Sequence, residues 1–262
     1  MIELNNILDY YPPFIAQNAA MHKHILKEYV ELLALEYISH SPYVAKLSFI
    51  GGTNLRLIQG IDRFSEDLDF DCKSLNESEF VSLTDDVIDY LRSCGLQAEA
   101  RDKSNQNITA FRRNIYFPEL LFELGLTGHR EERFLMKIEA QDQGINYANE
   151  IGLVNRVGFL FSVPVPNNSV LLSMKLSALL IRSKGRDFYD TLFLWQRADP
   201  DYDFLKKRVD IHSPYELKKR LIETLRTVDL QLKKRDFEHL LFSSAHSEQI
   251  LYFEKFLQEK IQ

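Results

Sequence analysis

Residues 49–71 read FIGGTNLRLIQGIDRFSEDLDFD, and the order of elements in this stretch decides the fold. The apolar run LSFI (47–50) predicts a buried strand that ends at a Gly-Gly turn. The residues TNLRLIQG (53–60) predict a short helix that the final glycine stops. The alternating run LDFDC (68–72) predicts a second strand beside the first. The stretch therefore predicts a strand, a turn, a helix and an acidic strand, in that order.

The acidic strand and the turn before it carry the first chemical signal. Asp67 and Asp69 are two positions apart, so on a strand their side chains share one face. Two acids on one face repel unless a cation lies between them, which favours Mg²⁺ (or Mn²⁺) with substrate phosphates as further ligands. Gly51 and Gly52 leave backbone N–H groups unshielded, and Thr53 adds a hydroxyl at the positive end of the next helix. The pattern predicts a phosphate cradle beside a metal pair; a plain turn before a half-exposed strand is the alternative.

Helices and strands alternate through the first part of the chain. Residues 15–39 carry apolar positions at three- and four-residue steps, which predicts an amphipathic helix. A second helix is expected over 76–93, with Asn76 as its N-cap. β-branched and aromatic runs predict strands over 97–102, 107–117 and 133–142.

The character of the sequence changes near residue 165. Residues 145–168 are expected to be irregular, because they contain two glycines and two prolines. Helical spacing then dominates, over 169–183, 186–197, 214–228, 234–242 and 247–260. The sequence thus predicts an α+β protein, with an α/β part over 1–165 and an all-helical part over 166–262.

The composition limits the class of protein. Of 262 residues, 45% are hydrophobic and 27% are charged, which excludes a wholly disordered chain. The net charge of −6 excludes an evenly basic coat for nucleic acid. The two cysteines form no disulfide framework, and neither a signal-peptide pattern nor an apolar stretch of membrane-spanning length is found. We therefore expect a soluble, cytoplasmic protein that does not enter a membrane.

Four stretches together resemble a known family. The residues GGT (51–53) and RFSEDLDF (63–70) are similar to the first motif of the polymerase-beta-type nucleotidyltransferase superfamily, and more narrowly of the AbiEii/AbiGii-type nucleotidyltransferase toxins. MKIE (136–139), KLSALLIR (175–182) and KGRDFYD (184–190) resemble the second, third and fourth motifs of that family. The resemblance covers about residues 46–197, and residues 200–262 match nothing recognisable.

The resemblance implies a fold, a reaction and a set of site residues. The fold would be a polymerase-beta-like mixed sheet with helices, and the helical region 166–262 would complete the active site. The expected catalytic residues are Asp67, Asp69, Lys175 and Asp187. The expected nucleotide-binding residues are Gly51, Gly52, Thr53, Arg63, Ser65, Lys137 and Lys175. The expected metal ligands are Asp67, Asp69 and Glu139. The implied partners are an NTP, an RNA acceptor such as the 3′ end of tRNA, and a cognate antitoxin.

Several of these residues also have a plainer interpretation. Lys175 either neutralises phosphate charge or lies on a solvated helix face. Asp187 either orients or deprotonates the acceptor, or favours the start of a helix through its charge. Glu139 could be a third metal carboxylate, and the alternative for this strand is a structural pair between Lys137 and a neighbouring acid.

A basic cluster suggests where triphosphate or RNA would bind. Arg182, Lys184 and Arg186 precede Asp187 in a stretch otherwise rich in Leu and Phe. Further basic residues follow at Lys206, Lys207, Arg208, Lys218, Lys219 and Arg220. The sequence leaves three functions open: a toxin that modifies RNA, a small-molecule nucleotidyltransferase of the antibiotic-modifying kind, and a non-catalytic binding module on the same fold. Transfer of label from NTP to RNA distinguishes them.

Overall fold

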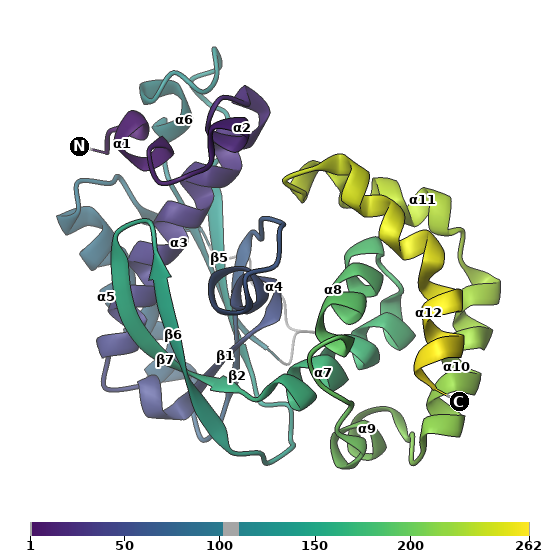
Figure 1. Ribbon diagram of the computed structural model, residues 1–262. Helices are drawn as coiled ribbons and strands as arrows, with labels where there is room; N and C mark the ends of the chain where they lie inside the picture. Colours follow the sequence, from purple (N-terminus) through teal and green to yellow (C-terminus); the bar gives the residue numbers. More distant parts are fainter. Residues whose placement is uncertain (1, 102–109, 262) are drawn as a thin grey trace. The chain divides into compact units, whose positions relative to one another are not determined.

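The computed structural model describes residues 2–101 and 110–261, which divide into two compact units (Figure 1). Unit 1 consists of Met1–Gly60, Phe64–Gly144 and Asn149–Val165. Unit 2 consists of Ile61–Arg63, Ile145–Ala148 and Pro166–Gln262. Two short segments from the first 165 residues thus belong to unit 2, and one of them lies between the predicted Gly-Gly helix and the acidic strand.

Unit 1 is built on a mixed five-stranded sheet with the strand order β1-β2-β5-β4-β3. The strands are β1 (Leu47–Ile50), β2 (Asp67–Cys72), β3 (Glu99–Ala100), β4 (Phe111–Tyr116) and β5 (Leu135–Gln141). β2 and β5 are parallel, and the other neighbours are antiparallel. The predicted strands are confirmed where the structure describes them; residues 102–109, which include parts of two predicted strands, lie outside the described residues.

The two faces of this sheet differ in chemistry. Leu68 lies opposite Ile138 and Phe70 opposite Ala140, and all four side chains are buried. Among the helices that contact the sheet, α3 (His22–His40) contacts β2 and β5, and α5 (Glu77–Ser93) contacts β3 and β4. Because side chains alternate along a strand, the residues between these apolar positions point to the opposite, polar face.

The helices of unit 1 follow the sequence with one correction. Asn76 caps α5, and its side chain accepts a hydrogen bond from the Glu79 N–H, as predicted. The single helix expected over 15–39 is wrong in its first turns, because Asn18 has an extended backbone and begins a new turn by capping Ala20. The segment therefore forms α2 (Pro13–Ala16), the 3-10 turn η1 (Ala19–Met21) and α3. Unit 1 also contains the short helices α1 (Leu4–Leu8) and α6 (Leu120–Glu123), the 3-10 turn η2 (Val44–Lys46) and the helix between β1 and β2.

The expectation of an irregular segment over 145–168 is wrong. Residues Asn149–Arg156 and Phe159–Pro166 form the two-stranded ribbon β6–β7 (Figure 1). Val157 and Gly158 connect the strands with φ values of 51° and 81°, the pair of positive values that a tight hairpin turn requires. Prolines are tolerated in β7 because a two-stranded ribbon has only edge strands. The glycines and prolines that suggested irregular chain are compatible with this ribbon.

Unit 2 is helical, which confirms the predicted helical C-terminal region. Its helices are α7 (Asn168–Arg182), α8 (Gly185–Trp195), α9 (Tyr202–Val209), α10 (Pro214–Thr227), α11 (Leu230–Arg235) and α12 (Phe253–Lys260). Helix α9 was not predicted from the sequence. The prediction of continuous helices over 234–242 and 247–260 is partly wrong. Those segments contain the 3-10 turns η4 (Glu238–Leu240) and η5 (Ser244–Tyr252), separated by extended backbone at Leu241 and Ser243. No helix of the described residues has the length and hydropathy needed to cross a membrane.

Candidate active site

The polar face of the sheet in unit 1 brings together four of the predicted site residues. In the parallel β2–β5 pair, Asp67 lies opposite Lys137 and Asp69 lies opposite Glu139. The Lys137 Nζ is 2.9 Å from Asp67 Oδ2 and 3.6 Å from Glu139 Oε1. The side chains of Asp67, Lys137 and Glu139 remain 30%, 28% and 21% exposed, respectively. The face is therefore charged and open to a ligand.

Three carboxylates act on Lys137 at this face. Burial lowers the pKa of Lys137, but its hydrogen bond to Asp67 and the charges of Asp67, Glu139 and Asp69 outweigh burial. The net result is a pKa above the usual value for lysine. The local field of the face thus favours a positive charge, which the Lys137 ammonium supplies in this structure.

The acids at this face could supply a magnesium ion with only a small number of protein ligands. No set of three or more His, Cys, Asp or Glu side chains within 2–101 and 110–261 is arranged to hold a metal ion. Glu139 forms an ion pair with Arg112 as well as with Lys137, so two cations already engage its carboxylate. Asp67 and Asp69 remain as two hard oxygen donors on one face, and Mg²⁺ is typically held by one or two carboxylates together with substrate phosphates.

The Gly-Gly turn packs directly against the acidic strand. Gly51 begins α4 (Gly51–Asn54), which continues without a break as the π-helical stretch η3 (Leu55–Gln59). The predicted helix is confirmed, but it starts two residues earlier than expected. Gly51 has a φ of 80°, and a Cβ atom there would lie 2.4 Å from Asp69 Oδ2. This position therefore requires glycine, both for its backbone conformation and for its close approach to the acid.

Thr53 and Ser65 are less accessible than the sequence suggested. The Thr53 hydroxyl donates to the Asp67 backbone carbonyl at 2.5 Å, and only 1% of the residue is exposed. Ser65 is 7% exposed. Gly52 is half-buried in the first turn of α4. Thr53 thus joins the helix to β2, and the turn and the strand form one rigid element.

Unit 2 contains a second charged cluster, and this one is buried. The Arg63 Nε and Nη2 donate to Asp190 Oδ1 and Oδ2, both at 2.7 Å. The Lys175 Nζ lies 2.8 Å from Asp190 Oδ2. Burial alone would raise the pKa of Asp190, but the charges of Arg63 and Lys175 outweigh burial and hold it well below its usual range. Both cations contact the same carboxylate, and the solvated-face interpretation of Lys175 is wrong because only 8% of it is exposed.

Asp187 lies one helical turn before Asp190 and has different partners. Its carboxylate is fully buried and accepts from Arg182 Nη2 at 2.8 Å and Arg182 Nε at 3.0 Å. It also accepts from the Lys184 N–H at 3.2 Å, which caps the start of α8. The carboxylate that contacts Lys175 is therefore Asp190, which the sequence analysis did not single out. Its position in KGRDFYD (184–190), one turn along from Asp187, was the available signal.

The segment Ile61–Arg63 is anchored in unit 2 by more than Arg63. The Asp62 carboxylate accepts from the Tyr189 hydroxyl at 2.5 Å and pairs with His246. The Phe242 N–H donates to the Asp62 carbonyl at 3.1 Å, and Arg63 forms an isolated β-bridge with Leu241. Residues beyond 237, in which no family motif was recognised, thus contact the segment that precedes β2 in the chain.

Solved structures share this architecture. The chain is similar to MenT4, a nucleotidyltransferase toxin from Mycobacterium tuberculosis H37Rv, with 16% identity, coverage of 99% of this chain and 90% of that chain, and a TM-score of 0.65. It is also similar to JHP933 from Helicobacter pylori, with 19% identity, coverage of 90% and 91%, and a TM-score of 0.52. The chain thus shares the fold of MenT4.

The sequence match defines the family. Residues 33–259 match the family described as "Nucleotidyl transferase AbiEii toxin, Type IV TA system", and the chain belongs to this family. The predicted resemblance is therefore confirmed. The match also includes most of the region 200–262, in which the sequence analysis recognised nothing. Among curated proteins, no match is found.

Proposed function

We propose that this AbiEii-family protein transfers a nucleotidyl group from an NTP to RNA in a reaction that depends on Mg²⁺ or Mn²⁺. The observation that carries the proposal is the polar face of the sheet, where Asp67, Asp69 and Glu139 surround one cation and the backbone of Gly51 packs against Asp69. A cation site beside an N–H-rich turn is the arrangement that binds a metal–triphosphate complex.

Asp67 and Asp69 would hold the metal ion, which when bound neutralises charge on the triphosphate. The N–H groups of Gly51 and Gly52 at the start of α4 would face phosphate oxygens, because the first turn of a helix leaves these donors unsatisfied. Lys137, which pairs with Asp67 in this structure, would contact a phosphate oxygen of the bound NTP. Glu139 would join as a third ligand only by giving up Arg112, so we assign it a supporting role.

We further propose that Lys175 neutralises phosphate charge during transfer and that Asp190 positions its ammonium. The cluster in unit 2 supports this assignment, because the buried Asp190 carboxylate holds the Lys175 ammonium at 2.8 Å. Arg63 acts through Asp190 in this proposal, since two of its donors bind that carboxylate. Asp187 contributes by capping α8, the helix that carries Asp190.

The proposed acceptor is RNA, specifically the 3′ end of tRNA, and the proposed regulatory partner is a cognate antitoxin. The net charge of −6 requires a local basic surface for RNA. The basic side chains of α9 and α10 supply candidates, namely Lys206, Lys207, Arg208, Lys218, Lys219 and Arg220. Binding through such contacts releases counterions, so it should weaken steeply with salt.

The test incubates the purified protein with each α-labelled NTP, Mg²⁺ and total RNA. We expect label in a small RNA band with one or more NTPs, loss of labelling with EDTA, and a steep decrease in labelling between about 50 and 200 mM salt. Expression of the wild-type protein without an antitoxin should slow bacterial growth, and Asp69→Ala should relieve the effect. Label on a small molecule with a shallow salt effect would instead support the antibiotic-modifying alternative, and no transfer at all would support a binding module.

A further inference from the structure

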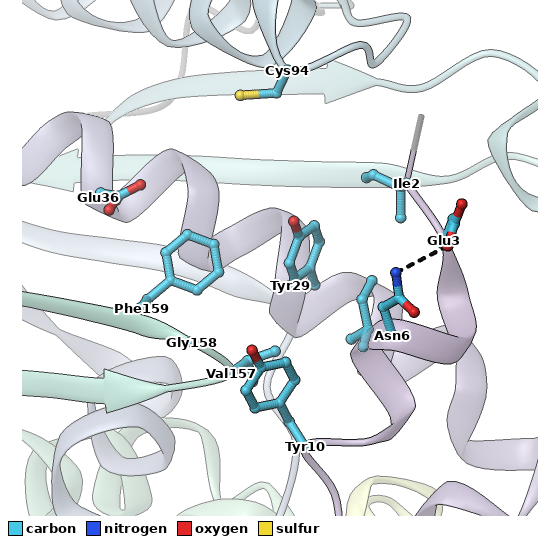
Figure 2. A pocket seen from close by; sticks show the side chains of 11 residues that line it. Ile2, Glu3, Asn6, Tyr10, Tyr29, Glu36, Cys94, Val157, Gly158 and Phe159 are labelled. Atoms are coloured by element: carbon cyan, nitrogen blue, oxygen red, sulfur yellow. Dashed lines mark hydrogen bonds between the residues drawn. The ribbon is translucent and has the colours of Figure 1, made fainter.

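A cavity of about 660 Å³ lies in unit 1, and none of the nucleotidyl-transfer residues lines it (Figure 2). Its walls come from α1, from α3 and from the turn between β6 and β7. Its volume is in the range of sites for small organic ligands and is far larger than a single ion needs. The side chains that define its chemistry are Tyr10, Tyr29, Phe159, Glu3 and Glu36.

Aromatic rings form one side of the cavity. Figure 2 shows Tyr10, Tyr29 and Phe159 around a common space, with Gly158 beside Tyr10. The rings of Tyr29 and Phe159 meet edge to face with centroids 5.7 Å apart. Tyr10 is 60% exposed, and a Cβ at Gly158 would lie 2.9 Å from its hydroxyl. Gly158 thus gives the Tyr10 ring room to lie at the mouth of the cavity.

The charge of the cavity is entirely negative. Glu36 accepts a hydrogen bond from the Tyr90 hydroxyl at 3.2 Å, and Glu3 accepts one from Asn6 at 3.0 Å. None of the described residues that line the cavity is Lys, Arg or His. Burial raises the pKa of the Tyr29 hydroxyl, and the nearby Glu36 carboxylate raises it further. The polar face of the sheet has a different charge pattern, because Lys137 lies among the acids there and pairs with Asp67.

The two carboxylates and three aromatic rings of the cavity favour one class of ligand over others. Phosphates and nucleotides are anions, and both carboxylates would repel them. A hard metal ion would leave most of the cavity and all three rings unused, since such ions prefer oxygen ligands. An ammonium or guanidinium group gains from the faces of Tyr and Phe rings and from a nearby carboxylate together.

We propose that this cavity binds an organic cation, an alkylammonium or guanidinium group attached to an apolar stem. The stem would contact Tyr29 and Phe159, while the charged end would lie between the Tyr10 ring and a carboxylate. The cation can come from two sources, a free polyamine or the lysine or arginine side chain of a peptide. The proposal is independent of nucleotidyl transfer.

The experiment is isothermal titration calorimetry of the full-length protein without NTP or metal. The free amine is spermidine, and the side-chain source is an acetylated and amidated Gly-Arg-Gly peptide. Gly-citrulline-Gly is the matched neutral control, because citrulline replaces the guanidinium by an uncharged urea of the same shape. We expect at least one cation to bind, and the citrulline peptide to bind at least about tenfold more weakly than the arginine peptide if the latter binds. Binding of spermidine alone would identify a free amine as the source.

Two variants test the site itself. Tyr10→Ala removes an exposed ring, and Glu36→Gln removes a charge but keeps an acceptor for Tyr90. Each should weaken cation binding about three- to tenfold. Glu123→Gln removes an exposed carboxylate of the same unit outside the cavity and should change nothing. No binding of either cation at 5 mM (about the limit of a usable titration), or equal affinity in all three variants, would overturn the proposal.

Discussion

Asp67 and Asp69 lie on β2 of unit 1 with partly exposed side chains, whereas Asp187 and Asp190 lie on α8 of unit 2 and are fully buried. Asp67 contacts one amine, that of Lys137, at a face open to solvent. Asp190 accepts two hydrogen bonds from Arg63 and one ion pair from Lys175. We therefore expect the acids on the sheet to exchange partners more readily than those on α8, because the former are partly exposed and the latter are buried.

The exposure and the partners of a carboxylate help to distinguish residues that bind a ligand from residues that position other side chains. A carboxylate that is exposed and paired with a single lysine gives up little when a metal ion replaces that lysine, since exposed ion pairs contribute about 0–1 kcal/mol. A buried carboxylate held by a guanidinium cannot be released without leaving charges unpaired. We therefore expect the two regions to respond in opposite ways to the loss of one acid.

The largest effect should come from Asp190→Asn. It removes the carboxylate charge that pairs with the buried Arg63 and Lys175, and breaking a buried ion pair typically costs about 3–5 kcal/mol of unfolding free energy. Urea unfolding followed by circular dichroism measures it. The triple variant Arg63→Met, Lys175→Met, Asp190→Leu should recover most of the loss, because well-packed apolar residues can replace a buried ion cluster. A loss below about 1 kcal/mol for Asp190→Asn would remove the contrast between the regions.

The next largest effect should come from Asp69→Asn, for which we expect a large loss of activity and little change in stability. Nucleotidyl transfer should decrease at least about a hundredfold, because charge neutralisation by a bound metal is worth several kcal/mol. The unfolding free energy should stay within about 0.5 kcal/mol or increase, since one of two neighbouring like charges is removed. Initial rates of RNA labelling and a thermal melt provide both values. Glu77→Gln, an exposed acid on α5, is the control; a stable Asp69→Asn enzyme with full activity contradicts the metal assignment.

Lys175→Met tests whether the buried cluster also serves the reaction. We expect kcat/KM to fall about ten- to hundredfold, the value of a lost charge-assisted phosphate contact. The loss of stability should be smaller than for Asp190→Asn, because Asp190 keeps both hydrogen bonds from Arg63. Steady-state kinetics and urea unfolding of the same preparation separate the two effects. Unchanged kinetics with reduced stability would limit Lys175 to a structural role.

The smallest effect concerns the pH dependence of Lys137. Its pKa is raised above the ordinary 10.5, so its stabilising contribution is complete below that value and is lost as the pH rises through the folded pKa. Wild-type protein should therefore lose unfolding free energy relative to Lys137→Met as the pH increases above about 10.5. Because the side chain is 28% exposed, solvent screening keeps the difference within about 1 kcal/mol. Parallel pH profiles of the two proteins test it, and identical slopes would show that the acids at this face do not act on Lys137.

Local signals in the sequence predicted most of the helices and strands and placed the two candidate acids on one strand. The apolar run before Gly51, the alternation after Glu66 and the cap at Asn76 each act within a few residues, so β1, β2 and α5 follow from the sequence. The ribbon β6–β7 was missed because Gly152 and Gly158 were interpreted without their context. Gly158 makes a turn with positive φ, and a Cβ at Gly152 would lie 2.6 Å from Ile58, a residue far away in the chain.

The family, the acidic strand with its glycine turn, and the helical character of the second half could all be predicted from the sequence. These follow from residue type and spacing, which set backbone conformation and the face that each side chain shares. Only the tertiary structure decided that Asp190, and not Asp187, contacts Lys175, that Arg63 is buried, and that Glu139 pairs with Arg112. The choice of partner for a charged group depends on which residues distant in the chain bury it, and no local pattern contains that information.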